Sequence, residues 1–257
     1  MRTPIKAVVA TTVTLPLLLS ACSSSSSPSP TTVVRIPVST TAQANAVAKA
    51  HGCDANPYAT ANTLSWSQEP ALSLQPHTAY SAIFTTTAGS FTVALNTTTT
   101  PYNTNNFIFL ARHGYYHCVI FHRVIPGFMN QGGDPTGTGT GGPGYVVKQN
   151  EFPTAVASAD AAHQYKLGAV AMANSCSQST PASSCPPTNG SQFFIVAGAQ
   201  GEALPPRYTD FGQVISGMST IDKINAEGDI NAASDGTGTN LKVTNRILSV
   251  TITTTSN

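Results

Sequence analysis

Two short segments of the chain hold side chains that can do chemistry together. Residues 121–134 have the sequence FHRVIPGFMNQGGD, and residues 189–195 have the sequence NGSQFFI. In the first segment Arg123 precedes large apolar side chains and an amide. A fixed guanidinium can donate a hydrogen bond to a lone pair that develops during a reaction. The apolar and amide side chains can contact a ligand that has both apolar and polar parts.

Residues 113–118 contain two imidazoles and a cysteine, which are common metal ligands. Gly114 interrupts any helix that would align His113 and His117 on one face. We therefore expect no metal site here, and no motif calls for a cofactor.

Five glycines at positions 137, 139, 141, 142 and 144 raise the question of a phosphate-binding loop. No Gly-Lys-Ser/Thr follows them, and no strand-loop-helix pattern surrounds them. A tight loop of Gly and Pro is the better interpretation of the glycines.

Ser191 is not predicted to be a hydrolase nucleophile, because it lacks the Gly-x-Ser-x-Gly pattern.

Taken together, the two segments resemble the signature of the cyclophilins. Residues 172–174 (MAN) resemble the third active-site segment of that family, and residues 210–214 (DFGQV) resemble the strand after its pocket. The resemblance covers residues 77–254. It implies a mainly β fold, a closed eight-stranded antiparallel β-barrel capped by two α-helices, with the glycine-rich loop beside the site.

The activity that the resemblance implies is peptidyl-prolyl cis/trans isomerisation, in which no bond is broken. Rotation about an X-Pro amide has a barrier of roughly 20 kcal/mol, because the nitrogen lone pair must leave resonance. A catalyst must grip the proline, hold the backbone and favour the twisted amide. Arg123 suits the role of electrophile, because its guanidinium can donate to the lone pair that appears only in the twisted amide. His122 is expected beside it in a supporting role.

The resemblance implies two sets of site residues. The catalytic set is Arg123, His122, Gln131 and Asn174. The substrate-binding set is Phe128, Met129, Ala173, Gln192, Phe194, Leu204 and Tyr208. The expected partners are proline-containing peptides and exported proteins.

The chain departs from the family pattern near the pocket. Tyr208 falls where many cyclophilins have His, Ala203 falls where they have Trp, and residues 175–188 form an insertion with two cysteines. Two hypotheses follow: an isomerase, or a membrane-tethered module that binds proline peptides without turnover. The intact catalytic set favours the isomerase.

The elements that must position these residues follow from apolar periodicity and turn residues. A turn at Ala88 and Gly89 predicts a hairpin, and Pro101 suits the first turn of a helix that Gly114 ends. Apolar side chains at three-residue spacing predict a second helix. The expected strands include residues 80–86, 90–96 and 241–253, and the expected helices are residues 101–113 and 216–227.

The N-terminus predicts export. Residues 1–21 are expected to be a lipoprotein signal peptide, because Arg2 and Lys6 precede an apolar run that is too short to span a bilayer. The run ends in LSAC, which resembles a bacterial lipobox, so Cys22 is expected to carry the lipid, including palmitate. The protein would then be extracytoplasmic and anchored to the bacterial cell membrane.

Three further segments are expected after the signal peptide. Residues 22–38 are rich in Ser, Pro and Thr and read as a tether. Residues 39–76 form an extension, in which residues 41–50 read as a short Ala-rich helix and Trp66 reads as a docking side chain. Residues 77–257 form the isomerase domain.

Four cysteines remain after Cys22, and an even number fits an oxidising compartment. Four cysteines allow three pairings. We favour Cys176 with Cys185, which closes a short loop, and Cys53 with Cys118, which ties the extension to the domain.

The composition excludes one class of partner. Only 9% of the residues are charged, with 12 basic and 11 acidic side chains. Nucleic-acid binding needs clustered Lys and Arg, so we expect no nucleic-acid partner. The expected oligomeric state is a monomer.

Overall fold

The structure is a computed structural model that describes residues 40–177, 179–228 and 241–256. The expected signal peptide, Cys22 and the tether lie outside the described residues. None of the helices within these ranges is both long and apolar enough to cross a membrane.

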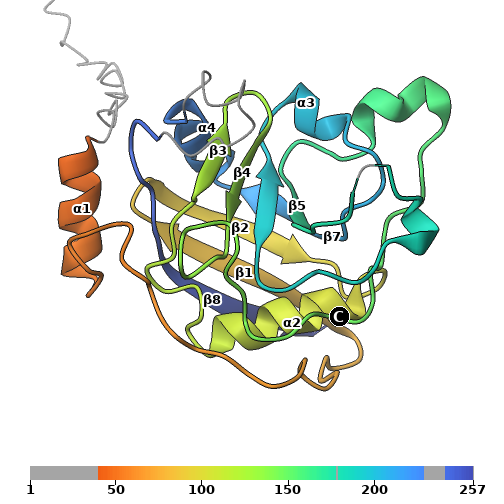
Figure 1. Cartoon of the computed structure of the whole chain (residues 1–257), viewed down its shortest axis with the longest axis horizontal. Helices are drawn as coiled ribbons and strands as arrows, with labels where there is room; N and C mark the ends of the chain where they lie inside the picture. The colour runs from red at the N-terminus through yellow and green to blue at the C-terminus, as the bar shows by residue number, and fades with distance from the viewer. Residues whose placement is uncertain (1–39, 178, 229–240, 257) are drawn as a thin grey trace, which may run out of the picture. The chain divides into compact units, whose positions relative to one another are not determined.

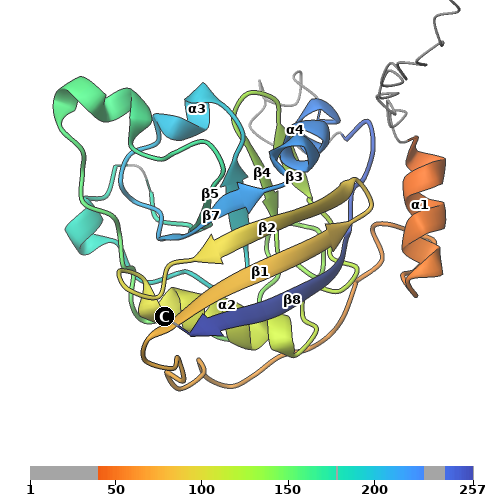
Figure 2. The same ribbon diagram turned by 180° about the vertical axis from the view of Figure 1, so that it is seen from behind.

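Eight strands form one antiparallel sheet in the order β3-β4-β6-β5-β7-β2-β1-β8. They are β1 (Thr78–Thr86), β2 (Gly89–Leu95), β3 (Arg123–Ile125), β4 (Met129–Gly132), β5 (Ala169–Met172), β6 (Phe193–Val196), β7 (Asp210–Ser216) and β8 (Ile247–Ser256). The long strands β2, β1 and β8 lie side by side (Figure 2). The expected hairpin is confirmed as β1 and β2, which pair from Tyr80 and Leu95 to Thr86 and Gly89.

The closed barrel that the resemblance implied is shown only in part, because hydrogen bonds do not close the sheet. Over the described ranges, the two end strands of the sheet, β3 and β8, do not pair with each other. An isolated bridge between Ile120 and Arg246 joins the segments that precede them, and the N–H of Cys118 also donates to the carbonyl of Ile247 at 2.8 Å. After this bridge the two segments separate, because β3 turns into a short hairpin with β4 while β8 follows β1 along its whole length. The eight-stranded antiparallel sheet is confirmed, and hydrogen bonds do not close it.

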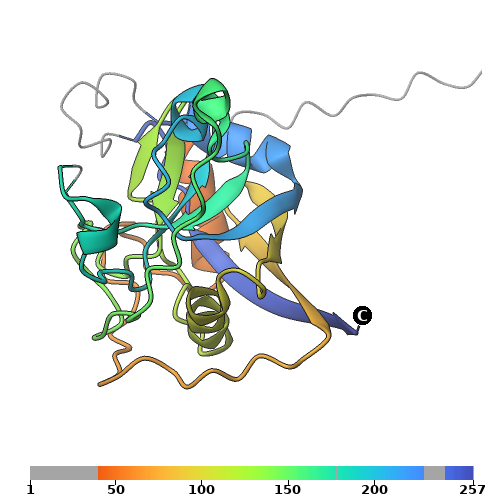
Figure 3. The ribbon, with the colours of Figure 1, turned by 90° about the vertical axis from the view of Figure 1, so that its right-hand side faces the viewer.

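Within the described residues, four α-helices accompany the sheet. They are α1 (Thr41–Ala50), α2 (Pro101–Arg112), α3 (Ala199–Glu202) and α4 (Met218–Ala226), with 3-10 turns at Ser158–His163 and Ala182–Ser184. The helices α2 and α4 confirm the two expected helices and lie at opposite ends of the sheet (Figure 1, Figure 3). Pro101 occupies the first turn of α2. The carboxylate of Glu151 accepts hydrogen bonds from the backbone N–H groups of Tyr102 (3.0 Å) and Asn103 (2.9 Å), which satisfies donors that a helix start leaves open.

Aromatic side chains fill the space between the sheet and α2. Phe84 stacks on Phe91 with ring centroids 4.5 Å apart, and Phe107 of α2 packs edge-on to Phe193 of β6 at 6.1 Å. Successive residues of a strand face opposite sides of the sheet. Burial of Phe193 in this core therefore turns its neighbour Phe194 to the other side of β6, where a second apolar cluster forms.

Side-chain contacts hold the N-terminal extension against the domain. Trp66 packs against Phe109 of α2, with ring centroids 5.1 Å apart. Arg246 is only 2% exposed, and its guanidinium donates to the Asn45 side chain of α1 (3.0 Å) and to the Asp54 carbonyl. The expected docking of Trp66 is confirmed, and residues 41–50 form the helix α1.

The structure contains both disulfides that the sequence favoured. Cys53 is bonded to Cys118, at a sequence separation of 65, and Cys176 is bonded to Cys185, at a separation of 9. The first ties the end of α1 to the segment before β3. The second closes the insertion at residues 175–188.

The two disulfides should differ in their contribution to stability. In the chain-entropy model, loops of these two lengths predict losses of about 4 kcal/mol for Cys53→Ser/Cys118→Ser and about 2.5 kcal/mol for Cys176→Ser/Cys185→Ser. Denaturant unfolding of the two double variants beside the wild type measures the difference. Equal losses, or a larger loss for the short loop, would contradict the expectation.

Candidate active site

The register of three neighbouring strands brings distant residues into one row. Arg123 of β3 lies opposite Gln131 of β4, and Gln131 lies opposite Phe194 of β6. Phe194 in turn lies opposite Ala171 of β5. Residues directly opposite in an antiparallel pair share a face, so Arg123, Gln131 and Phe194 project to the same side of the sheet.

This row forms one wall of a small pocket with a volume of about 130 Å³. Its lining is Arg123, Phe128, Met129, Gln131, Ala173, Asn174, Phe194, Leu204 and Tyr208. All nine belong to the site that the sequence predicted. The ring of Phe194 meets that of Tyr208 edge-on, with centroids 5.2 Å apart, so aromatic rings and a guanidinium line the same pocket.

The guanidinium of Arg123 is held at the edge of the small pocket. Its Nη1 donates to Oε1 of Gln131 at 3.4 Å and contacts Sδ of Met129 at 4.0 Å. Burial lowers the pKa of Arg123, while the neighbouring Tyr208 acts to raise it. Arginine remains charged in proteins, so the pocket presents a partly desolvated cation with fixed N–H donors.

His122 precedes Arg123 in the chain and does not line the small pocket. The side chain is 4% exposed, and neither ring nitrogen has a hydrogen-bond partner among the described residues. The pKa of His122 is lowered to about 4, mainly by burial and in part by the nearby Arg123, although Asp134 acts to raise it. The imidazole is therefore neutral near pH 7. This placement fits the supporting role expected for it better than a role in contact with substrate.

A larger pocket of about 410 Å³ adjoins the small one and shares Gln131, Ala173 and Asn174 with it. Gln192 lines this larger pocket. The Nε2 of Gln192 donates to the carbonyls of Gly139 (2.9 Å) and Gly141 (3.0 Å), and its Oε1 accepts from Gln131 Nε2 (3.1 Å). Gln192 thus connects the glycine-rich loop to the row that carries Arg123.

Asp134 shapes the glycine-rich loop from inside. Its carboxylate accepts hydrogen bonds from the backbone N–H groups of Gly139 (2.6 Å) and Gly141 (3.1 Å), and from both the N–H and the hydroxyl of Thr136 (2.8 Å each). Burial acts to raise the pKa of Asp134, but these hydrogen bonds outweigh it and the pKa lies below its usual value. The ionised carboxylate of Asp134 therefore stabilises the conformation of the glycine-rich loop.

Two residues outside the predicted set position the far side of the small pocket. The carbonyl of Arg207 accepts from Asn174 Nδ2 (2.8 Å), while its guanidinium donates to the carbonyls of Ser177 (2.9 Å) and Thr180 in the insertion. The hydroxyl of Tyr165 donates to the carbonyl of Tyr208 (2.9 Å). No local pattern marks Arg207 or Tyr165, because their roles depend on tertiary contacts.

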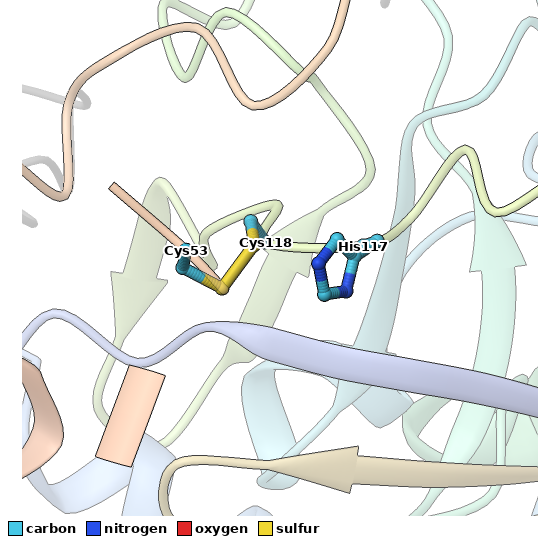
Figure 4. A group of neighbouring side chains, drawn as sticks. All are labelled: Cys53, His117 and Cys118. Atoms are coloured by element: carbon cyan, nitrogen blue, oxygen red, sulfur yellow. A yellow bond between two sulfur atoms is a disulfide. The ribbon is translucent and has the colours of Figure 1, made fainter. Parts of the chain in front are cut away.

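Cys53, His117 and Cys118 bring one nitrogen and two sulfurs within 4.8 Å of one another, but the two sulfurs are bonded to each other (Figure 4). Metal ligation by cysteine needs the thiolate. His117 Nδ1 also contacts the carbonyl of Leu248 at 2.7 Å. The group is therefore a disulfide with a neighbouring histidine, and its sulfurs are not thiolates.

Comparison with known proteins identifies relatives of this arrangement. A family model described as cyclophilin type peptidyl-prolyl cis-trans isomerase/CLD matches residues 81–252. Peptidyl-prolyl cis-trans isomerase-like 1 of Aspergillus oryzae is 44% identical over 141 residues, which is 55% of this chain and 79% of the relative. Peptidyl-prolyl cis-trans isomerase ppi1 of Schizosaccharomyces pombe is 40% identical over 139 residues, 54% of this chain and 81% of the relative.

Two solved structures are similar as well. A cyclophilin type peptidyl-prolyl cis-trans isomerase of Cryptosporidium parvum has a TM-score of 0.55 and 28% identity, covering 68% of this chain and 98% of its own. A crystal structure of the same isomerase in the presence of the dipeptide Ala-Pro has a TM-score of 0.54 and 29% identity, covering 67% and 98%.

The pKa of His122 makes a prediction about stability. Its folded-state value of about 4 is below the unfolded value of 6.5, so the unfolded chain binds the proton first as pH falls. His122 therefore contributes stability above pH 6.5 that is lost as the pH falls toward 4. Between pH 7.5 and 4.5 this residue should account for a loss of about 2 to 3 kcal/mol in the free energy of unfolding.

The variant His122→Asn isolates this contribution, because all other titrating groups are common to both proteins. Urea unfolding at pH 7.5 and 4.5 should show a steeper loss for the wild type than for the variant. Parallel pH dependences would mean that His122 is protonated as readily in the folded as in the unfolded state.

Proposed function

The chain belongs to the cyclophilin-type peptidyl-prolyl cis-trans isomerase family, and we propose that its small pocket isomerises X-Pro bonds of exported proteins at the outer face of a bacterial membrane. The observation that carries the catalytic part is the partly desolvated guanidinium of Arg123, which lines the same pocket as the rings of Phe194 and Tyr208. Proline-containing peptides are the proposed ligands, in keeping with the Cryptosporidium isomerase that was crystallised in the presence of Ala-Pro.

The proposed reaction is a rotation and needs no proton transfer. In either planar form the nitrogen lone pair of the proline is delocalised into the carbonyl and accepts no hydrogen bond. In the twisted form the lone pair is localised and can accept one from Arg123. This interaction exists only in the transition state, so it lowers the barrier without tightening the binding of either planar form.

The other residues of the small pocket hold the proline ring and the peptide backbone. Phe194 and Tyr208 form an apolar corner for the pyrrolidine ring, and Met129, which is 1% exposed, closes the floor. The amides of Gln131 and Asn174 line the pocket and can hold the peptide backbone on either side of the ring. Holding the ring and backbone in this way confines the rotation to the X-Pro bond.

The low dielectric around Arg123 strengthens its effect. A guanidinium in water would be screened, whereas one that is partly buried interacts more strongly with a nearby lone pair. Gln131 fixes its orientation through the hydrogen bond to Oε1, so little reorganisation is needed during the rotation. The neutral His122 next to it in the chain adds no competing charge.

The membrane part of the proposal comes from the N-terminal sequence. Residues 1–22 have the order of a lipoprotein signal, with basic residues, an apolar run and then Cys22. The two disulfides support an oxidising compartment. X-Pro bonds of newly exported chains equilibrate over tens of seconds unaided, which makes such a compartment a place where an isomerase is useful.

Substitution of Arg123 by Ala tests the catalytic proposal. The variant should lose about a hundredfold or more in kcat/KM, in the range seen when one preorganised donor is removed. A protease-coupled peptide assay measures the loss, and Arg112→Ala, an exposed arginine at the end of α2, is the matched control. Turnover by Arg123→Ala close to that of Arg112→Ala would rule out the mechanism. An inactive wild type that still binds proline peptides would favour the binding-module alternative.

Substitution of Cys22 by Ser tests the anchor. Without the lipid-bearing cysteine the protein should move from the membrane fraction to the soluble fraction, because the lipid supplies the buried methylene groups that hold it. Ser23→Ala serves as a control that keeps the cysteine. Continued membrane association of Cys22→Ser after high-salt washing would contradict lipid attachment at this position.

A further inference from the structure

The extension between α1 and β1 contacts the glycine-rich loop at several points. We call residues 61–69 the strap and residues 135–148 the glycine loop. The backbone N–H of Ala61 donates to the carbonyl of Pro135 at 2.8 Å, and the N–H of Trp66 donates to the carbonyl of Pro143 at 2.9 Å. These two hydrogen bonds hold the glycine loop near its beginning and near its end.

Two further contacts bring the strap and the glycine loop close together. Gly144 has φ +89°, and a Cβ there would lie 2.2 Å from Ser65 Oγ and 2.7 Å from the Trp66 carbonyl, so any side chain would collide with the strap. The carboxylate of Glu69 accepts from the backbone N–H of Lys148 at 3.0 Å. The strap therefore lies directly against the glycine loop and leaves no room for a side chain at position 144.

The strap is itself held by a rigid part of the fold. The Trp66 ring packs against His113 (5.6 Å) and Tyr115 (6.0 Å), in addition to Phe109. Asn62 Nδ2 donates to the carbonyl of Tyr115 at 2.7 Å. The strap thus takes its position from α2 and the turn after it.

From the glycine loop, a continuous series of hydrogen bonds leads to the guanidinium in the small pocket. The loop carbonyls of Gly139 and Gly141 orient the amide of Gln192, and Gln192 Oε1 accepts from Gln131. Gln131 Oε1 accepts from Arg123. An amide has one donor and one acceptor end, so the loop carbonyls fix which end of Gln192 faces Gln131.

We propose that the strap is a positioning element of the active site, which holds the glycine loop so that Gln192 and Gln131 present Arg123 correctly. This inference rests on the proposed isomerase function and extends it to a part of the chain outside the matched family region. The extension is then part of the working enzyme and not a spacer between membrane and domain. Trp66 is its central positioning residue.

The test uses the full chain with Trp66→Ala, Trp66→Phe and, as matched control, Leu72→Ala. Leu72 lies in the same extension, is 51% exposed and is not part of the strap. Trp66→Ala should lower kcat/KM about tenfold, because small displacements of catalytic groups carry large losses. Trp66→Phe should restore most of it, and Leu72→Ala should match the wild type.

Two more readouts separate positioning from loss of stability. Assays are run well below the melting temperature of each variant, and the side-chain amide resonances of Gln192 are followed by NMR. Trp66→Ala should shift these resonances, and in the Arg123→Ala background it should cause no further loss of kcat/KM, since its effect passes through Arg123.

Several results would overturn the proposal. The first is a kcat/KM of Trp66→Ala equal to that of the wild type. The second is a double variant in which the losses from Trp66→Ala and Arg123→Ala add in full. The third is a set of Gln192 amide resonances that do not shift in Trp66→Ala. If Trp66→Ala does not fold, Ala61→Pro is the alternative variant. It removes the hydrogen bond from the Ala61 N–H to the Pro135 carbonyl and keeps the Trp66 ring, and the predictions made for Trp66→Ala apply to it. An inactive wild type would contradict the proposed isomerase function. It would not contradict the positioning of Gln192 by the strap, because the NMR shift of Gln192 is measured without turnover.

Discussion

The register between β3, β4 and β6 is the constraint on which the site depends. Arg123, Gln131 and Phe194 come from three strands, and they meet because they are directly opposite one another. A slip of one residue would turn Phe194 into the core and Phe193 out of it. The aromatic core opposes that slip, because Phe193 is surrounded by Phe84, Phe107 and other rings. Core packing therefore fixes the chemistry on the opposite face.

Charge in this site is used sparingly. Arg123 is the charged residue that lines the small pocket. The carboxylate of Asp134 accepts hydrogen bonds from backbone N–H groups of the glycine loop. The pKa of His122 is affected by both of these charges, and its imidazole is neutral near pH 7. A desolvated guanidinium is costly unless its N–H groups are directed, and Gln131 directs at least one of them. The arrangement suits a reaction in which a lone pair appears and no proton moves.

The continuous motifs predicted most of the site, because residues 121–134 contain the hairpin of β3 and β4 and residues 189–195 contain most of the neighbouring strand β6. Local pattern also identified β1, β2, α2 and α4. It did not determine whether the sheet closes, since closure depends on how β8 and β3 run relative to each other at long range. Arg207 was missed for a similar reason: it acts through the carbonyls of an insertion 27 to 30 residues away.

Two sides of the small pocket are thus supported by different parts of the chain. On one side Arg123 depends on Gln131, Gln192 and the glycine loop. On the other side Asn174 is held by the carbonyl of Arg207, whose guanidinium is bound to the disulfide-closed insertion. Changes in the insertion can therefore alter how a peptide is held without moving the group that lowers the barrier. This separation explains how the chain can depart from the family pattern around the pocket while the row from Arg123 to Phe194 stays intact.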